Sequence, residues 1–160
     1  MGESVDIDRD VRIREFTMAD KELVRDFFDQ MGGETMAFFN RGDGNRKTAM
    51  GFFDGVMKNT LFWLAEYEGK MVGYVFIWDM ASMIPWLGIA VSEDMKGKKL
   101  GRRLMKRAAD TAVSEGKGGI LLTCHLANAR AQALYERCGY IRMGTHTSGE
   151  ALYLLRFEAK

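Results

Sequence analysis

Twelve consecutive residues, 96–107, read KGKKLGRRLMKR and contain seven basic side chains, two glycines and no acidic side chain. The whole chain is nearly neutral, with 23 Lys and Arg against 22 Asp and Glu, so positive charge is concentrated here. The segment follows the apolar run GIAV through the short loop SEDM and opens a stretch with helical spacing. A helix N-terminus presents unpaired N–H groups and a partial positive charge, which bind anions. We therefore expect a phosphorylated ligand here, held mainly by main-chain groups.

An ordinary solvated helix face is the alternative interpretation of the same charges. Lys106 and Arg107 lie two turns into the predicted helix, where we expect them to be only solvated. The Walker pattern GxxxxGK[ST] and the dinucleotide pattern GxGxxG are both absent from the sequence. No aromatic residues alternate with the basic ones to stack on bases, and the formal net charge is only +1. A nucleic-acid partner is therefore not expected.

The composition predicts a single globular domain over residues 1–160, because 47% of the residues are hydrophobic and 28% are charged. No apolar run reaches the roughly 18 residues of a membrane span, and the acidic start MGESVDIDRD is unlike a signal peptide. Two cysteines are too few for a disulfide framework, which favours a cytoplasmic location. We expect residues 1–10 to form a mobile tail, and we expect no metal site and no membrane partner.

Hydrophobic periodicity predicts a mixed α/β fold, with a mostly antiparallel sheet flanked by helices. Strands are expected at VRIREF, in a hairpin around Glu68-Gly69-Lys70, in IPWLGIAV after Pro85, at GGILLTC and at ALYLLRFE. Helices are expected from Thr17 to Gly32-Gly33, around Lys47 to Lys58, from Leu100 to about Glu115, and from Asn128 to Cys138 with Gly139 as the stop.

Residues 87–105, LGIAVSEDMKGKKLGRRLM, are similar to the acyl-coenzyme A binding segment of the GNAT superfamily of N-acyltransferases. The signature of that segment, [QR]xxGx[GA], falls on residues 96–101. Gly101 matches the last position, whereas Lys96 stands for the Gln or Arg and Lys99 stands for the middle glycine. The strand–loop–helix setting matches as well.

A second segment, NARAQALYERCGY at residues 128–140, resembles the family's later pattern Asn-x-x-Ala-x-x-Leu-Tyr-x-x-x-Gly-[FY] without a gap. One predicted helix and one predicted strand separate the two segments, as the family's architecture requires. The resemblance covers residues 86–140 and identifies the chain as a member of the GNAT superfamily, with the acyl-CoA N-acyltransferase fold. It implies acetyl-CoA as co-substrate, with its pyrophosphate as the anion at the basic segment.

The resemblance also implies roles for individual residues along the coenzyme. The pantetheine arm would pair with the strand Leu87 to Val91 like an added strand, with main-chain contacts at Ile89, Ala90 and Val91. The phosphate groups would be held by the loop and helix start, at Lys96, Gly97, Lys98, Lys99, Leu100, Gly101 and Arg102.

Two residues of the second segment receive roles in the same way, each beside a plainer alternative. Tyr135 would be the general acid that protonates the coenzyme A thiolate, since a phenol with a pKa near ~10 is a suitable donor. It would otherwise be a tyrosine that packs at a helix edge. Asn128 would contact the coenzyme arm, and it could also serve as the N-cap of the following helix.

The general base and the acceptor pocket are not readable from the sequence. Asp79, Glu66 and Glu34 are candidate bases, water is another, and His125 is expected to be a surface histidine. Cys124 and Cys138 are expected to be small apolar fillers. The family builds its acceptor pocket before the hairpin, so either that pocket or the core is expected to contain Met36, Phe38, Phe39, Phe52, Phe53, Met80, Met83 and Trp86.

The function that the resemblance implies is transfer of an acetyl group from acetyl-CoA to a primary amine of a small molecule or a protein. Such an enzyme must hold the thioester and the amine together, stabilise an oxyanion and protonate the leaving thiolate. The alternative is a non-catalytic module that binds coenzyme A as a sensor or partner domain. Whether the protein forms a homodimer stays open.

Overall fold

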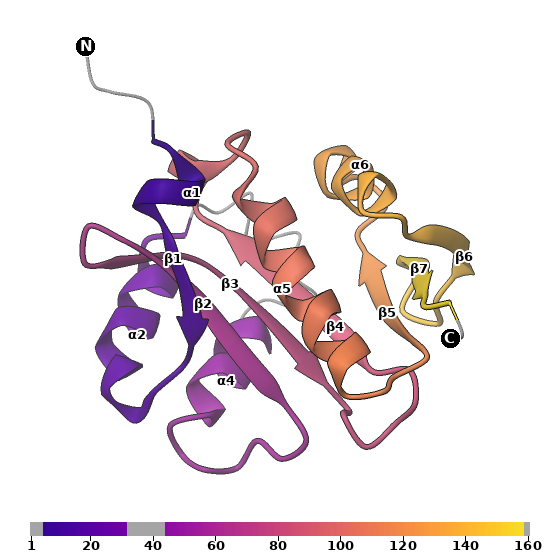
Figure 1. Cartoon of the computed structure of the whole chain (residues 1–160), viewed down its shortest axis with the longest axis horizontal. Helices are drawn as coiled ribbons and strands as arrows, with labels where there is room; N and C mark the ends of the chain where they lie inside the picture. The colour runs from indigo at the N-terminus through magenta and orange to yellow at the C-terminus, as the bar shows by residue number, and fades with distance from the viewer. Residues whose placement is uncertain (1–4, 32–43, 159–160) are drawn as a thin grey trace.

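Seven strands form one sheet in the computed structural model, which describes residues 5–31 and 44–158. The strand order is β1-β2-β3-β4-β5-β7-β6 (Figure 1). The strands are β1 Arg12–Glu15, β2 Leu61–Tyr67, β3 Lys70–Trp78, β4 Trp86–Val91, β5 Gly119–Cys124, β6 Ile141–Thr145 and β7 Ala151–Arg156. The pair β4–β5 is parallel, and the other neighbouring pairs of the described sheet are antiparallel. The predicted mixed α/β fold with a mostly antiparallel sheet is confirmed.

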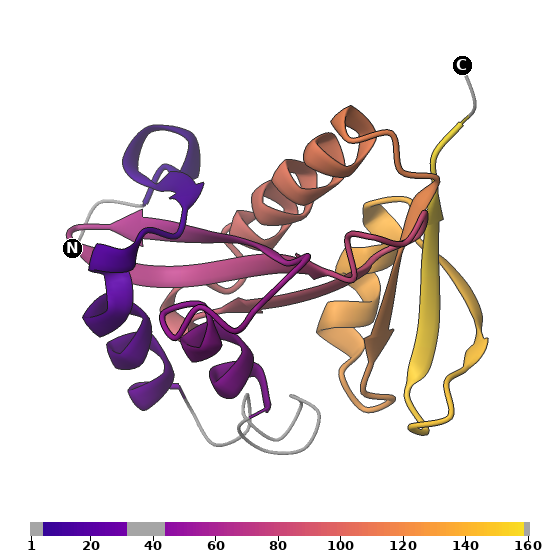
Figure 2. The same ribbon diagram turned by 90° about the horizontal axis from the view of Figure 1, so that it is seen from below.

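Helices cover both faces of this sheet (Figure 2). Helices α2 (Lys21–Asp29) and α4 (Gly44–Gly51) lie on one face, and α5 (Leu100–Ser114) lies on the other. Helix α6 (Ala129–Arg137) shares the core of α5, and the short helices are α1 (Ile7–Asp10), η1 (Met18–Asp20) and η2 (Glu93–Met95). No helix in the described part of the chain is long and apolar enough to span a membrane.

Two hydrophobic clusters fill the two sides of the sheet. The larger one joins α5 and α6 to the strands through residues such as Leu104, Ile120 and Tyr135. The smaller one joins α2 to β2 and β3 and is rich in aromatic rings, including Phe27 and Tyr74. The apolar residues of α2 therefore face the sheet, as their helical spacing predicts.

Several predicted boundaries shift in the structure. The second helix was expected at Lys47 to Lys58, but α4 spans Gly44–Gly51 and is followed by turns. Because Gly51 has no side chain, the segment that follows it can pack closely against it. A Cβ at this position would lie 3.0 Å from the Met57 side chain. The predicted stop at residues 32–33 lies outside the described residues.

The N-terminal residues also differ from the expected tail. Residues Ile7–Asp10 form α1, and Asp6 caps it by accepting hydrogen bonds from the N–H groups of Asp8 and Arg9. Ile7 and Val11 are buried in the larger hydrophobic cluster. The alternating aspartates hide this arrangement in the sequence, because two apolar residues four apart in a polar segment give only a weak helical signal.

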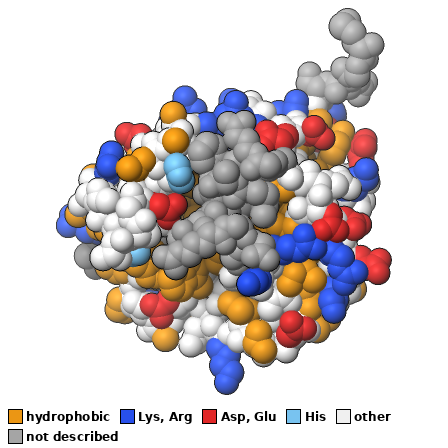
Figure 3. Space-filling model, turned by 180° about the vertical axis from the view of Figure 1, so that it is seen from behind, with side chains coloured by type: hydrophobic (Ala, Val, Ile, Leu, Met, Phe, Trp, Pro, Cys, Tyr) orange, Lys and Arg blue, Asp and Glu red, His pale blue; other side chains and the backbone are white. Residues whose placement is uncertain are grey.

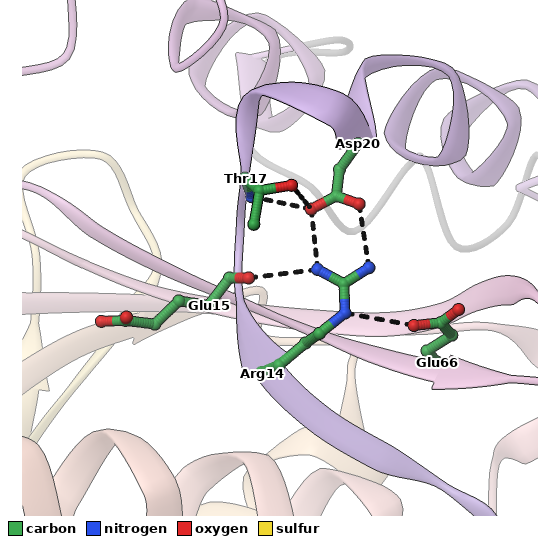
Figure 4. Close-up of polar contacts among 5 residues, drawn as sticks. All are labelled: Arg14, Glu15, Thr17, Asp20 and Glu66. Carbon is green, nitrogen blue, oxygen red and sulfur yellow. Dashed lines mark hydrogen bonds and ion pairs between the residues drawn. The ribbon is translucent and has the colours of Figure 1, made fainter.

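An ion-pair network ties β1 to β2 and to the start of α2 (Figure 4). Arg14 donates two hydrogen bonds of 2.8 Å to Asp20 and one of 3.1 Å to Glu66. Asp20 also accepts the Thr17 N–H at 2.7 Å. The Arg14 guanidinium lowers the pKa of the buried Asp20 carboxyl from 3.8 to about 2. These groups satisfy one another and hold the first elements on the sheet.

Candidate functional site

The strands β4 and β5 meet at one point only and then separate. Their recorded pairing is Trp86↔Leu121, whereas β4 pairs with β3 over its whole length. The Ser92 N–H donates to the Val72 carbonyl at 2.9 Å, and antiparallel bonding alternates along a strand. The main-chain groups of Ile89 and Val91 therefore point away from β3. They face the opening between β4 and β5 that begins after the pair Trp86↔Leu121, and we call this opening the fork. This edge can pair with an extended ligand.

The two strand residues and their neighbour Ala90 have different surroundings. Ile89 and Val91 pack against the larger cluster, on the side of α5. Ala90 is buried in the smaller cluster, and its main-chain groups pair with β3 in this register. Ile89 and Val91 thus face the fork with their main-chain groups, whereas Ala90 is a packing residue.

The loop from β4 to α5 is bent by two left-handed residues, Gly97 with φ 79° and Lys99 with φ 69°. The N–H groups of Lys96 and Lys98 already donate to Glu93 and Met95 carbonyls within the loop. The Arg103 N–H donates to the Lys99 carbonyl at 3.3 Å as the helix begins. The N–H groups of Leu100, Gly101 and Arg102 come before this first helical bond and therefore have no partner within the helix. They lie at the helix N-terminus, where an anion can accept hydrogen bonds from them.

An open cavity of about 350 Å³ lies beside this helix start. Five basic side chains and the acidic N-terminal segment surround it, and its lining residues are Val5, Asp6, Ile7, Asp8, Lys98, Lys99, Arg102, Arg103 and Lys106. Asp8 forms an ion pair with Arg103. The excess of positive charge makes the cavity a suitable place for phosphate groups.

Not every predicted phosphate ligand reaches this cavity. Lys98, Lys99 and Arg102 line it, whereas the Lys96 ammonium forms an ion pair of 3.0 Å with Glu93. Leu100 is fully buried in the core, so it offers only main-chain atoms. Lys106 was expected to be only solvated, but it lines the cavity as well as pairing with Asp110.

Gly101 has a packing role that the sequence did not indicate. A Cβ at this position would lie 3.0 Å from Cδ2 of Leu134 in α6. The missing side chain therefore lets α5 and α6 come together on the same side of the sheet. The resemblance places Gly101 among the phosphate-holding residues, and the structure adds this helix contact.

Tyr135 and Asn128 both belong to α6. Tyr135 is buried, and its ring meets Tyr140 at 6.2 Å and Tyr153 at 5.9 Å between centroids. Burial, with Cys124 nearby, raises the pKa of the Tyr135 phenol well above its ordinary value. Asn128 is the N-cap of α6, since its Oδ1 accepts the Ala131 N–H at 3.1 Å.

The candidate bases are scattered. Glu66 is engaged by Arg14, His125 is exposed with its Nδ1 accepting the Ala127 N–H, and Glu34 lies outside the described residues. Asp79 is exposed in the turn that ends β3. None of the described candidates is on β4. The two cysteine thiols are not suitable bases either, because burial raises the pKa of Cys124 to about 12 and also raises that of Cys138.

The residues expected around an acceptor divide into core and surface. Phe53 is buried and Phe52 partly buried, and both rings pack against Phe16, at 6.1 and 5.5 Å between centroids. Met80 packs against the larger cluster, Met83 is exposed and Trp86 is half-buried. Met36, Phe38 and Phe39 lie outside the described residues.

Three side chains near the fork were not predicted from the sequence: Trp78, His146 and Glu150. Trp78 stacks on Trp86 of β4, and the His146 ring meets Trp86 edge-on. Glu150 is a buried carboxylate at the start of β7. No local pattern marks these residues, since they meet only through strand pairing. No group of three or more His, Cys, Asp or Glu side chains in the described ranges is arranged to hold a metal ion.

Comparisons with known proteins agree with this geometry. The model of the acetyltransferase (GNAT) family matches residues 21–140, most of the chain. An uncharacterized protein of Mycobacterium leprae (strain TN) is 31% identical over 129 residues, which are 74% of this chain and 35% of that protein. The chain thus spans about a third of the length of that curated relative.

Solved structures share the fold at low sequence identity. A PaiA N-acetyltransferase from Thermoplasma acidophilum in complex with coenzyme A has a TM-score of 0.76 at 15% identity, covering 92% of this chain and 99% of that one. A GNAT-family acetyltransferase from Streptococcus pneumoniae has a TM-score of 0.74 at 22% identity, with the same coverage of 92% and 99%. A ribosomal-protein-S5-alanine acetyltransferase from Vibrio fischeri has a TM-score of 0.76 at 12% identity, covering 92% of each chain. With a family match over residues 21–140 and this fold, the chain belongs to the acetyltransferase (GNAT) family.

Proposed function

We propose that this protein transfers the acetyl group of acetyl-CoA to a primary amine in a ternary complex. The observation that carries the proposal is the junction of β4 and α5. No described residue pairs with the strand edge at Ile89 and Val91, which can therefore pair with an extended arm, and the cationic helix start follows it directly. A coenzyme with an amide-containing arm and phosphate groups matches both parts.

The phosphates would lie on the N–H groups of Leu100, Gly101 and Arg102, with Lys98 and Lys99 adding charge from the cavity. The arm would run along β4, and a strand N–H would polarise the thioester carbonyl. The amine nitrogen forms the new bond to the acetyl carbon as the carbon–sulfur bond breaks, and the amine loses a proton.

Tyr135 would donate its proton to the departing thiolate. Its raised pKa keeps the phenol protonated at neutral pH, so it is ready to donate, although it is a weaker acid than an exposed tyrosine. The hydroxyl makes no recorded hydrogen bond with another described residue. A hydrogen bond to the developing thiolate would therefore not have to replace one within this part of the protein.

A non-catalytic module that binds coenzyme A is the second candidate. It is favoured by β4 itself, whose residues WLGIAV include no acid or histidine that could act as a base. The two candidates share the coenzyme site and differ in the chemistry. We also propose a cytoplasmic location, and the two free cysteines are the observation that supports this proposal.

The test separates binding from turnover. Coenzyme A binding is measured by calorimetry, and a panel of amines is screened with acetyl-CoA by following free thiol release. Acetylation of at least one amine, with loss of thiol release in Tyr135→Phe, supports the enzyme. Coenzyme A binding without turnover of any amine supports the non-catalytic module instead.

A further inference from the structure

One line of apolar side chains crosses five strands of the sheet. The strand registers pair Trp78 with Trp86, Trp86 with Leu121, Leu121 with Leu154, and Leu154 with Ile141. Residues that pair directly lie on the same face of a sheet, so all five share one face. Four strand spacings of ~4.8 Å make this row about 19 Å long. We call these five residues the cross-sheet row.

The cross-sheet row belongs to neither hydrophobic cluster. Its neighbours along β5, Ile120 and Leu122, point to the opposite face and into the larger cluster. Trp78 is 41% exposed and Ile141 is 66% exposed, and the side chains between them are partly buried. Figure 3 views the molecule from behind, and on that side hydrophobic side chains lie next to a histidine. The row is therefore an apolar surface within reach of a ligand.

The row passes through the fork. Its pair Trp86↔Leu121 is the point at which β4 and β5 separate, and Ile89 follows three residues later on β4. The Trp86 indole stacks on Trp78 at 5.6 Å and 13° between planes, and the Trp86 and His146 rings form a T-shaped contact at 5.7 Å and 82°. The aromatic part of the row thus lies beside the place proposed for the thioester.

A buried carboxylate lies on the same face. Glu150 is 9% exposed and precedes β7, in alternation with the row residue Leu154. It accepts a hydrogen bond of 2.9 Å from Thr123, which stands two residues after Leu121 on β5. No ion pair joins Glu150 to a cation among the described residues. A buried carboxylate without a cationic partner is unusual and marks a candidate functional site.

The turn before β7 holds Glu150 in place. The His146 N–H donates to the Glu150 carbonyl at 2.8 Å, and the Glu150 N–H donates to the Ser148 hydroxyl at 3.3 Å. His146 Nδ1 accepts the Ser148 N–H at 3.0 Å. The same turn therefore fixes the ring against Trp86 and the carboxylate at Thr123.

We propose that this face binds the acceptor, a primary amine with an aromatic or branched aliphatic body, whose amino group meets Glu150 while its body lies on the cross-sheet row. The inference rests on the proposed acetyl transfer. The negative carboxylate complements an arriving ammonium, and the row complements an apolar body. The bound ammonium releases one proton to solvent before the attack. In the transfer, the nitrogen–carbon bond forms, the carbon–sulfur bond breaks, Glu150 takes the second proton from the nitrogen and Tyr135 gives one to the thiolate. Glu150 then returns its proton to solvent, and Tyr135 regains one from solvent.

The experiment compares phenethylamine, which has an aromatic body, with ethylamine, which lacks one, in the wild-type protein and in variants, with kcat/KM referred to the concentration of the neutral amine. We expect a kcat/KM at least tenfold higher for phenethylamine, and Trp86→Ala should remove most of that preference. Glu150→Gln should lower kcat/KM for both amines at least tenfold. Met18→Ser, at an exposed apolar residue outside the row, is the control for a general effect of surface substitution.

Binding is measured separately from turnover. Trp63 is buried, so fluorescence quenching by phenethylamine with coenzyme A bound reports on Trp78 and Trp86. Quenching that is lost in Trp86→Ala supports the inference. Turnover of ethylamine as good as that of phenethylamine in every variant would overturn it and leave the acetyltransferase intact. Coenzyme A binding without turnover of any amine would overturn the proposed function and the inference together. A dimer that Ile141→Lys dissociates, without any quenching, would assign the row to a second copy of the chain.

Discussion

Replacing Lys99 by glycine tests the geometry of the helix start most directly. Lys99 has a φ of 69°, in the left-handed region that costs a non-glycine residue about 1 kcal/mol. Glycine adopts this conformation freely, although it loses more entropy on folding. We expect Lys99→Gly to raise the free energy of unfolding by about 0.5–1 kcal/mol and the Tm by roughly 1–4 °C for a chain of this size.

Lys98→Gly is the matched control, because it removes the same charge from the same cavity at a residue that lacks a positive φ. It should lower the Tm slightly, since glycine there only adds entropy to the unfolded chain. Both variants keep four of the five basic side chains around the cavity, so we expect coenzyme A affinity to fall by no more than about fivefold in each.

Thermal unfolding by circular dichroism and calorimetric titration with coenzyme A measure the two effects. Equal Tm changes in Lys99→Gly and Lys98→Gly would refute the reasoning about the left-handed residue. A complete loss of coenzyme A binding in Lys99→Gly alone would mean that this ammonium is itself an essential phosphate ligand.

Three further predictions concern charge and proton transfer. The folded-state pKa of Asp20, about 2 against 3.8, stabilises the fold above pH 4 by about 2 kcal/mol, and this is lost as the pH falls through 2. Asp20→Asn should therefore be less stable than wild type in urea at pH 7 and equal to it below pH 2, and an unchanged gap would contradict the pairing with Arg14. Asp8→Asn frees Arg103 and should tighten coenzyme A binding about twofold, an effect that 0.5 M NaCl removes; weaker binding would instead make α1 part of the ligand site. Tyr135→Phe should lower kcat about 10²-fold with little change in coenzyme A affinity, and the defect should shrink with a more acidic leaving thiol. Near-normal turnover would reduce Tyr135 to a packing residue.

Much of the fold was predictable because its signals are local. Helix α5 begins at Leu100 as predicted and ends at Ser114, one residue before the predicted end, since apolar residues recur at helical spacing over its whole length. The hairpin of β2 and β3 was predicted from Glu68-Gly69, and both residues have positive φ values in the structure. Asn128 and Gly139 bound α6 for the same reason, because caps and stops depend on one or two residues.

The wrong boundaries arise where the local signal was weak or misleading. Helix α4 ends at Gly51 although the apolar residues beyond it continue a helical spacing. Helix α1 forms because Ile7 reaches a core built mainly by residues far along the chain. Neither outcome depends on the segment alone, since tertiary contacts override intrinsic propensity.

The sequence by itself determined the family, the order of the main elements and the cationic helix start at residues 96–102, because each is written in a contiguous segment. Only the tertiary structure decided which side chains share a face at the fork. Trp86, Leu121 and Leu154 come from three strands, and a shift of one residue in any register would turn a side chain to the other face. Glu150 is likewise buried beside Thr123 by strand pairing across 27 residues, a contact that no local pattern of residues contains.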